Sequence, residues 1–323
     1  MSEKKKNITA KDEAELFRFI DRDDIASEKI TAPRYSYWKS VFRVFFRKKI
    51  NIFMIIVFVL IFLIAFIMPI FWPYNPMENV TNGNTYNLSP SAAMKYFGPN
   101  IKWILGTGTL GNSIFYGCIS GARTSLLLAV ICAAINMTVG ILVGAVWGYS
   151  KRVDAVMIVI YNIVANVPYI LLISVLVYII GSGFWPFVFA LTVTGWLGIA
   201  YFFRTQVMII RDREYSLASR CLGTPVARVI SKNILPFLTS VIVTLLATEL
   251  PSYISMEVFL SFIGVGLSAS VPSLGRMIQQ GQTAFLTYPW AFWPPVIIAS
   301  AITIILYLLG QNLADASDPR THM

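Results

Sequence analysis

Long apolar runs separated by polar segments dominate the pattern of this 323-residue chain. A helix that crosses a bilayer needs about 20 predominantly apolar residues. Six runs reach that length, and the first is too long and too far along the chain for a cleaved signal peptide. The runs cover residues 50–72, 126–147, 156–180, 184–208, 237–263 and 291–313. The pattern predicts an all-α integral membrane protein with six transmembrane helices.

Composition and charge support this fold class and indicate its orientation. Hydrophobic residues make up 56% of the chain and charged residues 13%, roughly half the charged fraction of water-soluble domains. Residues 1–49, 150–155, 204–236 and 314–323 hold 22 of the 26 lysines and arginines. Because basic loops near spans stay in the cytoplasm, we expect both termini to be cytoplasmic. The net charge of +10 then reflects topology, and no nucleic acid partner is expected.

The spans and loops divide the chain into five parts. Residues 1–49 should form a cytoplasmic tail ending in an interfacial helix, because YSYWKSVFRVFFRKK alternates aromatic and basic residues at helical spacing. Plain basic flanking of the first span explains this segment equally well. The other parts are the first transmembrane helix at 50–72, an external segment at 73–121, a five-helix core at 122–313 with a cytoplasmic loop at 209–236, and a cytoplasmic tail at 314–323.

Polar side chains interrupt two of the predicted spans. Asn162 and Asn166 lie one turn apart, and Pro168 removes a backbone hydrogen bond beside them. Glu249 lies within apolar sequence, with Ser252 three residues later. A carboxylate at membrane depth is costly unless it faces water or a partner. We interpret Asn162, Asn166, Glu249 and Ser252 as candidates for a translocation path; pairing of Glu249 within a subunit complex is the alternative.

Small residues form a stripe in the second span. Gly140, Gly144 and Gly148 recur at four-residue spacing and therefore lie on one face of a helix. Such a stripe lets a neighbouring helix approach closely, so we predict helix packing here in preference to a direct role in transport.

The sequence offers little for catalysis or metal binding. Its only histidine is the penultimate residue, His322, and Cys118, Cys132 and Cys221 have no CxxC spacing. There is no GxxxxGK[ST] phosphate-binding loop either. We expect no catalytic residue, metal site or cofactor in this chain, and any energy for its activity must come from a partner.

The polar segment RDREYSLASRCLGTPVARVISKNILP, between the fourth and fifth spans, predicts two helices separated by a glycine. Asp212 suits the N-cap of the first helix and Gly223 the position just after its end. Thr224 would cap a second helix, which would end at Pro236.

The first of these helices has features of a docking element. Glu214 in the first turn and Arg220 near the end both suit the helix dipole. Ser216, Ala218 and Ser219 would give it a smooth face that fits a groove on another protein. An ordinary amphipathic connector is the alternative.

This segment resembles the conserved cytoplasmic loop of ABC importer permeases, written EAA, three residues, G, nine residues, I, one residue, LP. Leu217, Ala218 and Ser219 occupy the EAA positions, Gly223 the glycine, Asn233 the isoleucine, and Leu235 and Pro236 the final pair. The run REYSLASRCLG is similar to the peptide-permease version of this motif.

The resemblance extends over roughly residues 35–320. LGTGTLGNSIFYGCISGARTSL resembles the LGTDxxGRDxxxRxxYGARxSL segment of oligopeptide and dipeptide permease C subunits, and SMEVFLSFIGVGL and DASDPR are also similar. Gly108, Asn112 and Ser113 replace the acidic, basic and acidic residues of that pattern, which puts the corresponding ion pairs in doubt. Glu257 falls in a family-like stretch, and we interpret it as structural.

The resemblance implies a type I ABC importer permease in the cell membrane of a prokaryote. Its partners would be a homologous second permease, two cytoplasmic ATPases that bind ATP and Mg, an extracellular or periplasmic substrate-binding protein, and a peptide substrate. The loop helix would lie in an ATPase groove. Residues of this coupling loop would be Glu214, Leu217, Ala218, Ser219, Arg220, Gly223, Leu235 and Pro236. A proton-coupled secondary transporter is the alternative.

Overall fold

The computed structural model describes residues 36–74, 96, 98–99, 104–109 and 111–318. It divides into two units, residues 1–40 and 41–323. In the first unit only the start of helix α2 (Tyr37–Arg47) is described. The rest of the predicted N-terminal tail, most of the predicted external segment and the last five residues lie outside the described residues.

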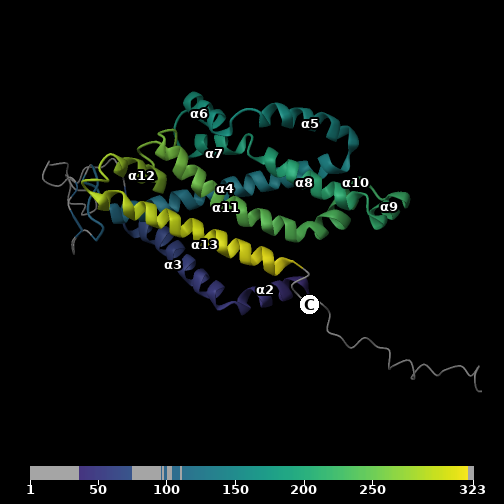
Figure 1. Cartoon of the computed structure of the whole chain (residues 1–323), viewed down its shortest axis with the longest axis horizontal. Coiled ribbons are helices and arrows are strands. Elements are labelled where there is room, and N and C mark those ends of the chain that lie inside the picture. Colours follow the sequence, from purple (N-terminus) through teal and green to yellow (C-terminus); the bar gives the residue numbers. More distant parts are fainter. Residues whose placement is uncertain (1–35, 75–95, 97, 100–103, 110, 319–323) are drawn as a thin grey trace, which may run out of the picture. The chain divides into compact units, whose positions relative to one another are not determined.

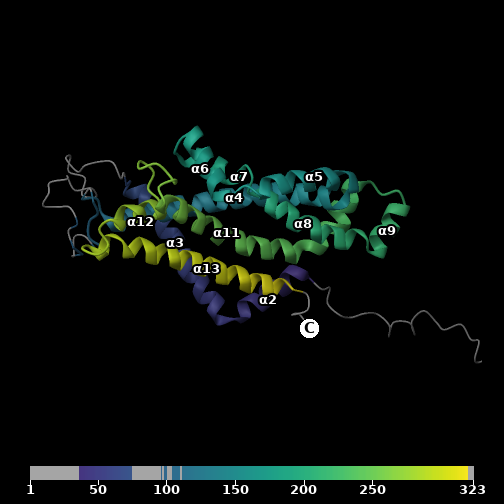
Figure 2. The ribbon, with the colours of Figure 1, turned by 45° about the horizontal axis from the view of Figure 1, so that its top comes forward.

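Helices make up most of the described part of the second unit. They are α3 (Lys49–Phe71), α4 (Ile114–Tyr149), α5 (Lys151–Ala165), α6 (Tyr169–Ile180), α7 (Phe184–Thr192), α8 (Trp196–Arg211), α9 (Glu214–Cys221), α10 (Val226–Arg228), α11 (Thr239–Phe262), α12 (Leu274–Gln282) and α13 (Trp293–Ser317). Figures 1 and 2 show α9 and the C-terminal end of α13 toward one end of the bundle and α12 toward the other. We call these the α9 end and the α12 end.

The hydropathy pattern locates the membrane-spanning helices well. Among the described residues, five stretches are long and apolar enough to cross a membrane, and there are six if the bent pair α5 and α6 counts as one. Helix α4 begins at Ile114, within the segment predicted to be external, and α13 continues to Ser317. Hydropathy marks only the apolar part of a helix, so these polar extensions were missed.

The predicted continuous span at 156–180 is wrong in one respect. Helices α5 and α6 meet at an angle of 80° across a short break. Pro168 lies just before α6, and the residue before a proline is pushed out of the helical region. The proline that the sequence places inside a span therefore turns the chain sharply.

The glycine stripe packs α4 against α8, as predicted. A Cβ atom added at Gly144 would lie 2.6 Å from the carbonyl oxygen of Ala200, and one at Gly148 would lie 2.5 Å from that of Arg204. These distances are too short for any side chain. The two backbones therefore touch along the stripe, which is how helices pack closely in lipid.

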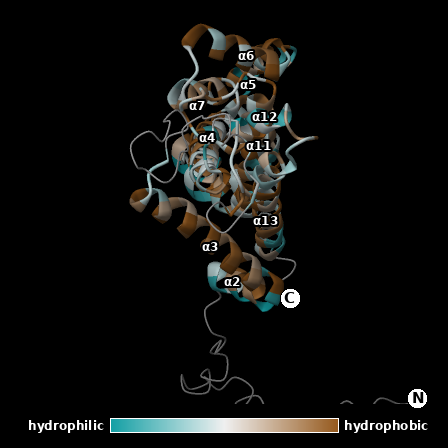
Figure 3. Ribbon diagram, turned by 90° about the vertical axis from the view of Figure 1, so that its left-hand side faces the viewer, coloured by the Kyte–Doolittle hydropathy of each residue, from teal (hydrophilic) through white to brown (hydrophobic). Residues whose placement is uncertain are grey.

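Large apolar side chains also cover outward faces of the bundle. Only 17% of the most apolar 18-residue stretch of α3 is buried. Figure 3 shows hydrophobic colouring on α3 and α6. Tyr178 and Ile179 on α6 are 90% and 73% exposed. Faces of this size and polarity suit lipid or another membrane-embedded subunit.

Candidate functional site

Helix α9 ends in a glycine stop, and this prediction is confirmed. Gly223 has a φ of +75°, its N–H donates to the Arg220 carbonyl at 2.9 Å, and the Thr224 N–H donates to the Ser219 carbonyl at 3.1 Å. These two bonds form a Schellman motif, which satisfies carbonyls at a helix end. An added Cβ at Gly223 would meet nothing within 4 Å, so glycine is favoured here by backbone conformation alone.

The other cap predictions are wrong. Arg213 is the N-cap of α9, while the Asp212 carboxylate accepts two 2.9 Å hydrogen bonds from the Arg211 guanidinium. That hydrogen-bonded ion pair lowers the pKa of Asp212. At α10 the N-cap is Pro225 rather than Thr224.

The second helix of the loop does not end at Pro236. The chain continues from α10 through a π-helical turn at Val229–Ile234 and a 3-10 turn at Leu235–Leu238 into α11. Proline removes one backbone N–H from the helical ladder. Here the helix changes its hydrogen-bond pattern around the proline and continues, so the loop is joined directly to a membrane-spanning helix.

Side-chain contacts hold α9 in place. The Asn233 amide donates a 2.7 Å hydrogen bond to the Ser219 hydroxyl, and the rings of Tyr215 and Phe237 lie 5.2 Å apart. The Arg220 guanidinium lies 5.6 Å from the ring centroid of Tyr149, at the end of α4. Helix α9 is therefore fixed to both the π-helical turn and the long helix α4.

The exposed face of α9 differs from the predicted smooth face. Ser216 is fully buried and Ser219 half-buried, which leaves Ala218 as the exposed small residue of the three. The most exposed large apolar side chains of the helix and its C-cap are Leu217, 43% exposed, and Leu222, 86% exposed. The loop therefore exposes two leucines instead of a smooth face of small residues, because the helix turns its serines toward the protein.

The remaining predicted loop residues are placed at the edges of this face. Glu214 is exposed in the first turn of α9, and Pro236 is exposed at the start of the 3-10 turn. Leu235 is half-buried and packs against the apolar cluster beneath the loop. Arg228 and Lys232 add exposed positive charge nearby.

An ion pair behind the loop was not predicted. Asp154 on α5 accepts two hydrogen bonds from the Arg204 guanidinium on α8, at 2.5 and 2.9 Å, and one from the Trp147 indole at 2.7 Å. The rings of Tyr161 and Tyr201 stack in parallel at 4.3 Å beside it. The partners lie up to 50 residues apart, so no local spacing in the sequence could have revealed the pair.

The structure brings together two of the four candidates for a translocation path. Glu249 and Ser252 line one groove of about 250 Å³. Its other lining residues are Tyr169, Thr194, Gly195, Gly198, Tyr253 and Met256. Asn162 and Asn166 do not line this groove. Both are exposed and belong to α5 and its C-cap, before the α5–α6 break. The Asn166 amide donates a hydrogen bond to the Asn162 carbonyl at 2.5 Å.

A buried polar network, also missed from the sequence, supports the groove. The Asn136 amide on α4 donates to the Tyr253 hydroxyl at 2.5 Å and to the Leu191 carbonyl at 3.3 Å. The Tyr169 hydroxyl donates to the same carbonyl at 2.9 Å. A Cβ at Gly195 would lie 2.5 Å from that oxygen. The network therefore fixes the interruption between α7 and α8 that forms one wall of the groove.

Glu257 lies at the α12 end and is fully buried. Its carboxylate accepts hydrogen bonds from Ser125 on α4 at 2.8 Å and from Ser261 on α11 at 2.9 Å. Ser273, the N-cap of α12, and the backbone of Gly275 also bond to it. The carboxylate therefore joins three helices, which agrees with its interpretation as structural.

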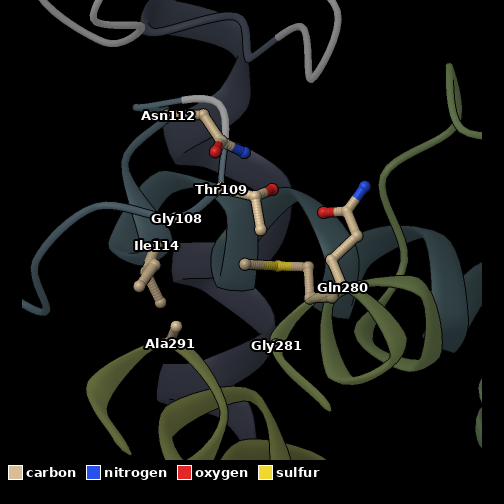
Figure 4. A pocket seen from close by; sticks show the side chains of 8 residues that line it. Gly108, Thr109, Asn112, Ile114, Gln280, Gly281 and Ala291 are labelled. Atoms are coloured by element: carbon tan, nitrogen blue, oxygen red, sulfur yellow. The ribbon is translucent and has the colours of Figure 1, made fainter. Parts of the chain in front are cut away.

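Two of the three departures from the family pattern, Gly108 and Asn112, line a small cavity of about 20 Å³ near the start of α4 (Figure 4). The backbones of Gly108 and Asn112 are joined by a 2.9 Å hydrogen bond, and the Asn112 amide donates to the Tyr74 hydroxyl at 2.5 Å. Ser113 caps α4 without a side-chain hydrogen bond. Burial raises the pKa of Tyr74 to about 12. Neutral hydrogen bonds therefore hold this turn in the described structure.

Comparison with known families defines the class of this protein. Residues 136–323 match the family model of the binding-protein-dependent transport system inner membrane component. Residues 36–90 match the N-terminal transmembrane domain of oligopeptide transport permease C. The chain belongs to this family of transport permeases, is a multi-pass membrane protein, and is a transport component rather than an enzyme. The resemblance inferred from the loop motif is confirmed.

Individual relatives narrow the class to peptide permeases. The chain is 47% identical to the oligopeptide transport system permease protein AmiD of Streptococcus pneumoniae, over 95% of this chain and 98% of the relative. It is 34% identical to the dipeptide permease DppC and 32% identical to the oligopeptide permease OppC of Bacillus subtilis, over 91% of this chain and 89% and 93% of those proteins. The alternative of a proton-coupled secondary transporter is not supported.

Proposed function

We propose that this chain is a transmembrane permease subunit of an ATP-driven oligopeptide or dipeptide importer in the cell membrane of a prokaryote. The observation that carries the proposal is the loop helix α9, which exposes Leu217 and Leu222 while contacts to Asn233 and Tyr149 hold it rigidly. The peptide-permease relatives support the choice of cargo.

The proposed complex contains a homologous second permease, two cytoplasmic ATPases and an external substrate-binding protein. ATP and Mg bind to the ATPases, and α9 lies in a groove of one of them. Exposed leucines suit such a groove because their burial on docking is favourable. Movement of the groove reaches the membrane through the continuous connection from α10 to α11.

In this proposal the α9 end is cytoplasmic and the α12 end external. The distribution of lysine and arginine supports it, since Lys151, Arg204, Arg213 and Lys232 all belong to segments near the α9 end. Both termini are then cytoplasmic, and α12 contributes to the external gate or to the docking surface for the binding protein.

We place the translocation path along the groove of Glu249 and Ser252. It is a partly open groove rather than an enclosed cavity, as expected when a second permease supplies the opposite wall. Asn162 and Asn166 belong to the path only if that subunit brings their exposed helix face next to the groove.

Affinity purification from native membranes in mild detergent, followed by mass spectrometry, tests the proposal. The tagged chain should bring down a second permease and two ATPases. Leu222→Glu should lose the ATPases and keep the second permease, because a charge cannot enter an apolar groove cheaply. Leu286→Glu is the matched control, since Leu286 is 84% exposed but lies toward the α12 end.

The proposal is wrong if the chain purifies alone or only with copies of itself in several mild detergents. Loss of the ATPases in both leucine variants would instead show that α9 is not the specific contact.

A further inference from the structure

Glu249 has no cationic partner within the described part of the chain. The ion pairs found there are Arg204 with Asp154 and Arg211 with Asp212. Glu249 is half-buried and lies near the middle of α11, within the stretch apolar enough to cross a membrane. A carboxylate in that setting needs water, a proton or a positive charge to offset its desolvation.

The groove around Glu249 suits a positively charged group in three respects. Its other lining residues are neutral, so no lysine or arginine competes for the carboxylate. The tyrosines Tyr169 and Tyr253 line it, and aromatic faces attract cations. Its volume of about 250 Å³ is well above the roughly 10–15 Å³ that one water molecule needs, so the groove is large enough for a chemical group of several atoms.

A hydrogen-bonded tyrosine lies beside the carboxylate in this groove. The Tyr253 hydroxyl accepts the Asn136 amide at 2.5 Å, which leaves its own proton free to donate. Glu249 shares a side-chain hydrogen bond with that hydroxyl. Tyr253 therefore stabilises the Glu249 carboxylate, and both side chains line the groove.

We propose that Glu249 and its groove form a binding site for the primary ammonium group of a peptide in transit. The inference rests on the proposed function and adds the chemistry of the ligand. An ammonium group donates three hydrogen bonds, and the Glu249 carboxylate and the Ser252 hydroxyl offer oxygen acceptors on the same wall. The ammonium comes from the peptide N-terminus or from a lysine side chain, and these sources share one chemistry.

Peptide import into liposomes that contain the complete reconstituted transporter tests the site. The probes are trialanine, N-acetyl-trialanine and an N-acetyl tripeptide with one lysine, each at a concentration that saturates the binding protein. Import is expressed per loaded binding protein, so that peptide selection by that subunit does not enter the comparison.

Glu249→Gln should slow import of trialanine about tenfold, the size expected for a lost hydrogen bond to a charged group, and leave N-acetyl-trialanine unchanged. Glu249→Asp keeps the charge and should retain part of the faster import of trialanine relative to N-acetyl-trialanine. Thr248→Ala is the matched control, because the exposed Thr248 hydroxyl bonds only to carbonyls of its own helix. If Glu249→Gln also slows import of the acetylated lysine peptide, the site accepts both ammonium sources. If import of that peptide is unchanged, the site accepts only the peptide N-terminus.

Equal slowing of trialanine and N-acetyl-trialanine in Glu249→Gln would overturn the inference, because it would indicate a structural role or an ion pair with the second permease. Unchanged import of both peptides would overturn it too. In each case wild-type import continues, so the proposed function stands. Absence of import by the wild-type complex would refute the proposed function itself.

Discussion

Asn233 donates a 2.7 Å hydrogen bond to Ser219, and both residues occupy positions at which this loop departs from the family pattern. The pattern has isoleucine and alanine there, which would meet through apolar contact. In this chain the two departures form one polar pair that joins α9 to the π-helical turn. Each substitution is explained by the other.

A double-mutant cycle should therefore show coupling between these residues. Ser219→Ala or Asn233→Ile alone should destabilise the loop by about 0.5–1.5 kcal/mol, because each removes the 2.7 Å hydrogen bond between the two side chains. The double variant restores the family residues and should cost less than the sum of the single changes. Hydrogen exchange of the α9 amides in the purified complex measures this. Strictly additive effects would show that the contact contributes nothing.

Gly223→Val should uncouple ATP hydrolysis from transport while the subunit stays in the membrane. Valine at a φ of +75° strains the backbone by about 1–2 kcal/mol, although space for the side chain is available. The strain should unwind the end of α9 and displace Leu222. Gly223→Asn is the matched control, because asparagine tolerates this conformation. Import and ATPase rates of reconstituted complexes measure the coupling, and normal import by the valine variant would refute this role.

Much of the fold could be predicted from the sequence because lipid imposes a simple rule. Every spanning helix must be apolar over a fixed length, so hydropathy found the candidate spans. The bend between α5 and α6 was missed because a proline in a span can either kink a helix or turn the chain. Contacts with other segments, such as the 2.9 Å hydrogen bond from the Tyr169 hydroxyl on α6 to the Leu191 carbonyl on α7, decide between the two, and such contacts are not a local property.

The candidate site was predictable only where one residue type fits one conformation. Gly223 was found because the end of a helix favours glycine. The exposed face of α9 was wrong because burial of Ser216 depends on contacts with distant segments. Asn136 and the pair of Asp154 with Arg204 were missed for the same reason, since their partners lie 50 or more residues away.

Gly144→Val should separate α4 from α8 and destabilise the subunit. The added side chain would overlap the backbone at Ala200, which cannot move without shifting the whole helix. Overpacking of this kind costs about 1–3 kcal/mol and more where backbone is displaced. Val146→Leu, on an exposed face of the same helix, is the control. Thermal unfolding of the detergent-solubilised complex measures the difference, and equal midpoints for both variants would contradict the packing role of the stripe.

Glu257→Ala should loosen α12 without affecting α9. Removing the buried carboxylate leaves the Ser125 and Ser261 hydroxyls without their acceptor, at a cost of about 1–3 kcal/mol for each unsatisfied group. Glu257→Gln should have a smaller effect because its carbonyl oxygen still accepts, and Ser255→Ala, on the exposed face of α11, is the control. Hydrogen exchange of the α12 amides should be fastest in Glu257→Ala, intermediate in Glu257→Gln and slowest in the wild type. Because Ser273 and Gly275 at the start of α12 bond to this carboxylate, the effect should be largest in the first turn of that helix. A uniform increase across the whole bundle would instead show that Glu257 supports general stability and does not hold α12 in particular.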